Sequence, residues 1–266
     1  MGLQEMRTVL ASALAFFSLL TSISLSQEKK TPPVLVVAAA ADLNPALKEI
    51  GNAYEKKTGE KVLISFGASG ALTQQIHNGG PYDLFFSADM DYPRQLIKSG
   101  EADPNSLSQY AVGKLVLWVP ADSPLDLEHQ GMKALLDSSV KKIAIANPQQ
   151  APYGRAAVAA LKHAGLYDQL ADKLVIGENV SQAAQFVESG NAQAGFIALA
   201  HALSPQIQGK GKYWEVPAED YPPLEQGVVV LSRSEHKQEA ANFVAHLKTK
   251  EAAAVLKKYG FMSPQK

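Results

Sequence analysis

The 266-residue sequence contains no cysteine. This absence excludes disulfide bonds, thiolate chemistry and an acylated N-terminal cysteine as a lipid anchor. The sequence also lacks a charge excess, because 25 Lys and Arg stand against 26 Asp and Glu. A formal net charge of -1 gives no general electrostatic reason to expect nucleic acid or an anionic membrane as partner. Any site for an anion must therefore be built locally.

No apolar run near the N-terminus is long enough for a membrane anchor. The run from Val9 to Leu20 is far shorter than the roughly 20 residues that span a bilayer. Arg7 precedes it, and small residues that include Ser24 and Ser26 follow. This order is typical of a secretory signal peptide, so we expect residues 1–26 to be removed by cleavage after Ser26. Without a lipid anchor, the mature protein is expected to be soluble and confined to a periplasm.

The usual sequence signs of catalysis are missing as well. None of the six histidines forms the i,i+4 pair that a zinc-binding helix uses. The segment from Gly67 to Ala71 is similar to a nucleophile elbow, but that motif requires glycine two residues after Ser69, where Ala71 stands. No base accompanies Ser69 in the sequence, so we do not expect an esterase.

From Val34 onward, short apolar runs alternate with longer amphipathic stretches. This alternation predicts βα units and a largely parallel sheet, and the 46% hydrophobic content suffices for a sizeable core. The predicted strands are Val34–Ala39, Lys61–Phe66, Leu84–Ser87, Leu115–Val119, Lys142–Ala146, Lys173–Ile176, Ala194–Ala198 and Gly227–Leu231. The predicted helices are Pro45–Lys57, Ala71–Asn78, Tyr92–Ser99, Arg155–Ala164, Ser181–Ser189, Lys237–Thr249 and Glu251–Tyr259.

The layout divides into two similar halves, each opening with two βα units, which predicts two lobes. We expect residues 32–112 plus 227–266 to form lobe 1 and residues 113–226 to form lobe 2. The chain then crosses between the lobes near Tyr110 to Leu115 and returns near Leu224 to Val228. Two crossing strands make a hinge, and a hinged cleft suits a protein that closes on a ligand.

Four strand-to-helix junctions carry the chemistry, because each ends in small or polar residues and begins a helix at once. A helix N-terminus exposes unpaired N–H groups and roughly half a positive charge, so four of them sum to about two charges, which matches a dianion. Arg155 is the one basic side chain among them, which predicts an anion site made of neutral donors. The junctions are Ala39–Leu43, Phe66–Ala71, Asn147–Arg155 and Gly177–Ser181.

Several segments together resemble the periplasmic molybdate-binding proteins of ABC transporters. They are VLVVAAAADLNPALKEI, FGASGALTQQIHNGGPYDLFFSAD, APYGRAA, GENVSQA and LKKYGF. The resemblance implies a two-lobed α/β periplasmic-binding-protein fold of type II, in which each lobe is a mostly parallel sheet flanked by helices and two crossing strands join the lobes. It also implies a monomer that holds dehydrated molybdate or tungstate through amides and hydroxyls, with no cofactor, and delivers it to a membrane permease. Molybdenum is then bound only as the oxyanion. Because the family carries out no catalysis, the resemblance predicts that the protein is not an enzyme.

The resemblance assigns ligand-binding roles residue by residue. Ser69 is expected to donate both its hydroxyl and its N–H, and Val180 its backbone N–H. Many family members have serine where this chain has Asp42, so we expect the Asp42 side chain to cap the helix while its N–H, or that of Ala41, faces the ligand. Tyr153 lies where some members place a tyrosine whose hydroxyl reaches the anion.

Simpler interpretations stand beside these. Ser69 as a helix cap and Tyr153 as packing at a helix start are both alternatives. Arg155 is interpreted as a solvated first-turn residue that can assist anion encounter, and Asp89 as a helix cap only.

Alternatives to the function also stay open. The ligand can be sulfate, phosphate or an organic anion, and Asp42 favours phosphate because a carboxylate can accept the proton of that ion. An exported hydrolase or deaminase that uses Ser69, Tyr153 or Asp42 and a purely structural envelope protein are the further alternatives.

Overall fold

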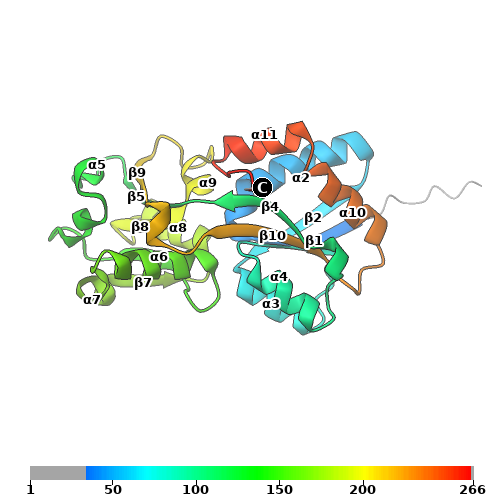
Figure 1. Ribbon diagram of the computed structural model, residues 1–266. Helices are drawn as coiled ribbons and strands as arrows, with labels where there is room; N and C mark the ends of the chain where they lie inside the picture. Colours follow the sequence, from blue (N-terminus) through cyan, green and yellow to red (C-terminus); the bar gives the residue numbers. More distant parts are fainter. Residues whose placement is uncertain (1–33, 265–266) are drawn as a thin grey trace, which may run out of the picture. The chain divides into compact units, whose positions relative to one another are not determined.

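The computed structural model describes residues 34–264, which belong to one compact unit. The predicted signal peptide and its cleavage site lie outside the described residues. The described chain builds two five-stranded sheets flanked by helices, as expected (Figure 1).

The first sheet has the strand order β2-β1-β3-β10-β4. Strand β1 pairs in parallel with β2 and β3, whereas β10 pairs antiparallel with β3 and β4. Four strands therefore run in one direction and β10 runs in the other. The strands are β1 Val34–Ala40, β2 Lys61–Gly67, β3 Leu84–Ser87, β4 Ser108–Gly113 and β10 Leu224–Val230.

The second sheet has the order β7-β6-β8-β5-β9 and repeats this plan. Strand β6 pairs in parallel with β7 and β8, and β5 pairs antiparallel with β8 and β9. Half of the strand pairs in each sheet are therefore antiparallel, which is more than the βα pattern predicts. The reason is that one strand in each sheet, β10 or β5, runs opposite to the other four. The strands are β5 Leu115–Pro120, β6 Ile143–Ala146, β7 Leu174–Gly177, β8 Ala194–Ala198 and β9 Gly211–Glu215.

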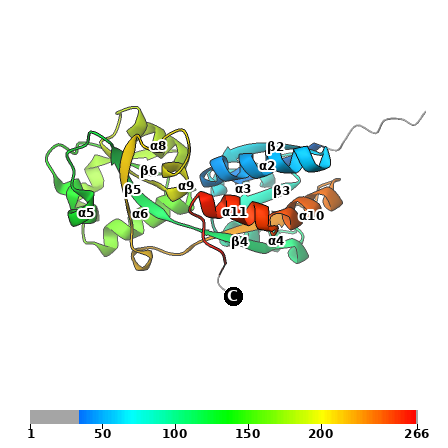
Figure 2. The ribbon, with the colours of Figure 1, turned by 90° about the horizontal axis from the view of Figure 1, so that it is seen from above.

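Helices cover the first sheet on both faces, which explains why its central strand β1 is apolar throughout. Successive residues of β1 point to opposite faces: Val37 packs in the cluster of Leu47 and Phe243, under α2 and α10, whereas Ala38 packs in the cluster of Leu72, under α3. In Figure 2, α11 lies beside α2, and Lys258 and Glu49 join the two helices by an ion pair. The helices are α2 Asn44–Thr58, α3 Ser69–His77, α4 Asp91–Lys98, α10 Lys237–His246 and α11 Lys250–Lys258.

The second sheet is packed mainly between α6 and α8, and its fully buried strand β6 reads Ile-Ala-Ile-Ala. Its helices are α5 Leu127–Gln130, α6 Pro152–His163, α7 Tyr167–Leu170, α8 Val180–Glu188 and α9 Leu199–Ala202. Short 3₁₀ turns complete the chain: η1 Ala41–Leu43, η2 Pro104–Ser106, η3 Gly131–Leu136, η4 Ala171–Lys173 and η5 Ala218–Asp220. No helix within residues 34–264 combines the length and the apolar character that crossing a membrane requires.

The chain passes between the two sheets twice. Lys114 alone separates β4 of the first sheet from β5 of the second, and residues 216–223 connect β9 back to β10. Strands β4 and β10 pair with each other, so both passages lie side by side (Figure 1). The domain bounds given above stay a prediction.

Candidate functional site

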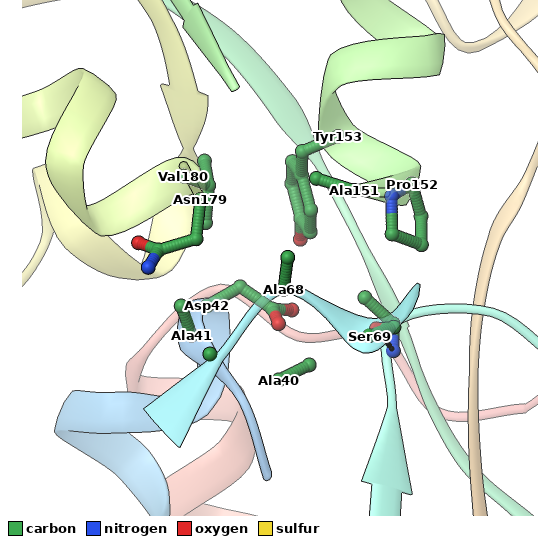
Figure 3. Close-up of a pocket in the computed structure, with 12 residues that line it drawn as sticks. Ala40, Ala41, Asp42, Ala68, Ser69, Ala151, Pro152, Tyr153, Asn179 and Val180 are labelled. Carbon is green, nitrogen blue, oxygen red and sulfur yellow. Dashed lines mark hydrogen bonds between the residues drawn. The ribbon is translucent and has the colours of Figure 1, made fainter. Parts of the chain in front are cut away.

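All four junctions identified in the sequence converge on one small pocket (Figure 3). The cavity volume is only about 10 Å³, so the pocket suits a single small ion rather than an extended organic molecule. Its lining holds no lysine, arginine or histidine. The lining residues are Ala40, Ala41, Asp42, Gly67, Ala68, Ser69, Ala88, Ala151, Pro152, Tyr153, Asn179 and Val180.

The first junction follows β1, where the run of alanines lets the backbone approach the pocket. Ala41 and Asp42 belong to the first turn after the strand, and both are buried. The N–H groups of a first turn have no preceding turn to bind. The Ala41 N–H can therefore face a ligand, whereas the Asp42 N–H lies close enough to its own carboxylate to lower the pKa of that group.

The expected capping role of Asp42 is wrong. Neither η1 nor α2 has a side-chain cap, and Asp42 Oδ2 instead accepts a hydrogen bond of 2.9 Å from Gln226 Nε2 on β10. Asp42 occupies the middle of η1, whereas a capping residue must precede the first turn. Its side chain is 0% exposed, and Oδ1 has no hydrogen-bond partner in the described chain.

Burial dominates the electrostatics of Asp42. Desolvation raises its pKa from 3.8 to about 7, although the Tyr153 hydroxyl, Gln226 and the N–H groups of Asp42 and Leu43 partly offset the rise. In Figure 3 the Tyr153 hydroxyl points towards the carboxylate, but no hydrogen bond of ordinary geometry joins it to Oδ1. Asp42 is therefore close to half protonated at neutral pH.

Ser69 opens α3 and is 1% exposed. The N-cap of this helix is Ala68, and no side chain caps it, so the alternative that Ser69 acts as a cap is wrong. Ser69 Oγ accepts a hydrogen bond of 3.0 Å from the Ala88 N–H. The hydroxyl hydrogen and the Ser69 N–H, at the first position of the helix, can both be donated to a ligand.

The last two junctions lie on the second sheet. Helix α8 is capped by Asn179, whose side chain accepts from the N–H groups of Ser181 and Gln182. This cap leaves the N–H of Val180, the first residue of the helix, for a ligand. Tyr153 follows Pro152 at the start of α6, and burial raises the pKa of its hydroxyl well above the ordinary value. Tyr153 therefore stays a neutral donor.

Arg155 and Asp89 also form a contact that the sequence did not predict. The Arg155 side chain is partly exposed, as expected for a first-turn residue, but it forms an ion pair with Asp89 and donates to Tyr92 Oη at 3.2 Å, so it links the second sheet to the first. Asp89 accepts from N–H groups at the start of α4 and also binds Arg155, so it is more than a cap. The Gly70 N–H adds a further link, to the Gln150 carbonyl at 2.8 Å.

A second contact between the sheets lies at α8. Ser181 Oγ donates to the Ala41 carbonyl at 3.2 Å and lies 2.7 Å from His201 Nε2. Burial lowers the pKa of His201 to about 4, so the ring is neutral. Its other nitrogen, Nδ1, has no partner in the described chain, so no carboxylate orients the ring for catalysis.

Sequence reasoning missed the residues that hold Asp42 from the crossing strands. Gln226 is fully buried on β10, and its Oε1 accepts from the Tyr110 hydroxyl on β4 at 3.0 Å. A Cβ at Gly113, also on β4, would collide with the Tyr153 hydroxyl, so glycine is required for the tyrosine to fit. The only available signal was a glutamine inside an apolar strand, which is weak by itself.

The geometry gives little support to an active site. Ser69 Oγ contacts the Ala88 N–H and has no base beside it. Within residues 34–264, no three His, Cys, Asp or Glu side chains gather in a way that could hold a bare metal ion. The arrangement is a small pocket whose lining offers N–H and O–H donors and no basic side chain.

Both the sequence and the fold are similar to those of known bacterial proteins. Residues 35–262 match the family described as bacterial extracellular solute-binding protein. The molybdate-binding protein ModA of Azotobacter vinelandii is 40% identical over 225 residues, which cover 85% of this chain and 88% of that protein. ModA of Rhodobacter capsulatus is 38% identical over 231 residues, which cover 86% and 88%. The solved structure of the A. vinelandii periplasmic molybdate-binding protein, 39% identical, matches with a TM-score of 0.82 over 87% of this chain and 100% of that one.

Proposed function

Because the chain belongs to the bacterial extracellular solute-binding protein family, we propose that it binds molybdate or tungstate and delivers it to the membrane permease of an ABC transporter. The observation that carries the proposal is the gathering of uncharged N–H and O–H donors from both sheets around one small pocket without a cationic side chain. Helix N-termini favour anions. Neutral donors suit a dehydrated dianion that the protein must later release to the permease.

Five residues are assigned to the ligand, with Ala41 and Asp42 as alternatives for one hydrogen bond. Ser69 donates its hydroxyl and its N–H, Val180 and Ala41 or Asp42 donate backbone N–H groups, and Tyr153 contributes its hydroxyl. Hydrogen bonds to a charged group contribute about 1.5–3 kcal/mol each, so these five hydrogen bonds contribute about 8–15 kcal/mol, which reaches or exceeds the roughly 8–12 kcal/mol of micromolar to nanomolar binding. The surplus offsets desolvation and closure.

The proposal also covers the location of the protein, its oligomeric state and its division into lobes. The protein works as a periplasmic monomer after cleavage of its signal peptide, with residues 32–112 plus 227–266 as one lobe and residues 113–226 as the other. It carries out no catalysis and needs no cofactor, since molybdenum is bound only as the oxyanion.

The test is calorimetric titration and thermal unfolding with molybdate, tungstate, sulfate and phosphate in turn. A ligand at about 1,000 times its dissociation constant should stabilise the protein by roughly 4 kcal/mol. Molybdate and tungstate should do so at concentrations where sulfate and phosphate have no effect. Equal affinity for sulfate or phosphate would overturn the assignment of the ligand, and consumption of a substrate would overturn the assignment as a binding protein.

Ser69→Ala tests the residue assignment in the same titration. Loss of a hydrogen bond to a charged ligand should weaken molybdate binding about tenfold to hundredfold. Ser189→Ala, which removes an exposed hydroxyl at the end of α8, is the control and should bind as the parent does. An unchanged affinity in Ser69→Ala would show that the wrong residue has been assigned.

A further inference from the structure

Asp42 is the one acidic side chain that lines the pocket. A carboxylate beside a dianion in a water-free pocket would repel it strongly, because charges interact more strongly where the dielectric is low. Asp42 is 0% exposed, and its Oδ1 has no partner in the described chain. An unpartnered buried oxygen at a binding site requires an explanation.

The surroundings of Asp42 contain no cation. From α6 it faces the Tyr153 hydroxyl and from β10 the Gln226 amide, and Tyr110 on β4 is near enough to interact with it electrostatically. His201 lies on α9, which packs against η1, and it is neutral because burial lowers its pKa to about 4. The residues that line the pocket from α3 and α8 do not ionise. The groups that face Asp42 therefore favour a neutral side chain over a charged one.

The hydrogen bonds of Gln226 fix where a proton on Asp42 must lie. Gln226 Oε1 accepts from the Tyr110 hydroxyl, so its Nε2 faces Asp42 and donates to Oδ2. In a neutral carboxylic acid the carbonyl oxygen is the better hydrogen-bond acceptor, so Oδ2, which accepts from this amide, is the carbonyl oxygen. The proton of a neutral Asp42 therefore lies on Oδ1, the oxygen without a partner, and can be donated into the pocket.

We propose that Asp42 binds the oxyanion as the neutral carboxylic acid, donating a hydrogen bond from Oδ1, and that one proton is taken up from solvent whenever an ionised Asp42 meets the anion. This inference rests on the oxyanion-binding function proposed above and assigns one further donor to that site. Protonation requires little work near neutral pH, because burial has already raised the pKa of the free protein's Asp42 to about 7.

The dependence of affinity on pH follows from the fraction of competent protein. If only the neutral form binds, the apparent dissociation constant is the intrinsic value divided by that fraction. Affinity should be nearly constant below about pH 6 and fall about tenfold per pH unit well above pH 7, which gives about a hundredfold loss between pH 6 and pH 9.

Calorimetric titration of the full protein with molybdate between pH 6 and pH 9 tests the proposal. Repeating the titration at pH 8 in two buffers of different ionisation enthalpy counts the protons exchanged, and we expect uptake of about 0.9 proton per anion. This measurement needs no variant, so it holds even where a substitution disturbs folding.

Asp42→Asn mimics the neutral acid, because its carbonyl can accept from Gln226 while its amide donates into the pocket. It should bind molybdate with the same affinity at every pH, take up no proton, and exceed the parent about tenfold or more at pH 9. Asp91→Asn removes an exposed carboxylate and should keep the pH profile of the parent.

The outcomes separate this inference from the function it rests on. A flat pH profile in the parent, with no proton uptake at pH 8, overturns the inference and leaves molybdate binding intact. An Asp42→Asn variant that loses molybdate at every pH, or a parent that prefers phosphate, shows Asp42 to be an acceptor for a protonated ligand and also overturns it. A parent that binds none of the four anions overturns the inference and the proposed function together.

Discussion

At the scale of single residues, Asp42 stands out because its side chain is buried without a counter-charge. Burial raises its pKa from the ordinary 3.8 to about 7. The folded protein therefore holds this proton more tightly than the unfolded chain. Between the two pKa values the folded state binds more protons, so the free energy of unfolding falls as pH rises from about 4 to about 7, and stays at the lower level above that.

Asp42→Asn should remove this loss of stability in the ligand-free protein. Relative to the parent, the variant should become more stable as pH rises, by up to about 4 kcal/mol between pH 4 and pH 8. Urea unfolding of both proteins at several pH values measures the difference. A stability difference that does not change with pH would show that Asp42 titrates normally in the folded state.

The placement of Ser69 and Val180 at the pocket could be predicted from the sequence, whereas the setting of Asp42 could not. Each of the first two lies at a strand-to-helix junction that is visible within a few residues. Gln226 is 184 positions from Asp42, and only the pairing of β10 in the first sheet brings the two together. A local pattern therefore suggested a cap for Asp42 where tertiary structure supplies a different partner.

At the scale of elements, the helix N-terminus of α8 can be tested without disturbing the helix. Val180→Pro removes one N–H at the first helical position, where proline is well tolerated, and Asn179 already has the extended conformation that precedes proline (φ -148°, ψ 177°). Molybdate affinity should fall about tenfold to hundredfold while the melting temperature of the ligand-free protein changes little.

Val180→Ala is the matched control for this prediction. It trims a side chain that is 3% exposed, so it should lower the stability of the fold while keeping the N–H and most of the affinity. If alanine weakened binding as much as proline does, the side chain of Val180 rather than its N–H would be the important group.

The elements themselves could be predicted unevenly. Strands β3 and β8 have the predicted bounds because they are short, apolar and fully buried. Strands β4 and β9 escape prediction because few of their side chains are buried, so no apolar run marks them. Strand β10 begins at Leu224, before the predicted Gly227, because its first residues include Glu225 and Gln226 and its register shifts after Gln226.

At the scale of the whole molecule, the sheets are joined by the paired strands β4 and β10 and also by side-chain contacts across the pocket. One of these is the ion pair between Arg155 and Asp89, and the Cζ atom of the same guanidinium lies 5.4 Å from the centre of the Tyr92 ring. In a hinged protein such a contact forms only when the two lobes come together. It should therefore slow the escape of the ligand.

Arg155→Ala should speed molybdate dissociation about threefold to tenfold, a modest effect because the Arg155 side chain is 41% exposed and its ion pair is screened by solvent. The effect should shrink at high salt, since screening already weakens the pair in the parent. Arg94→Ala is the control, because Arg94 is an exposed residue of α4 that pairs only with Asp91 in the described chain. Stopped-flow measurements separate the two rate constants. A slower association with unchanged dissociation would instead give Arg155 the role of attracting the anion from solvent, and would show that its contact with Asp89 does not hold the lobes together.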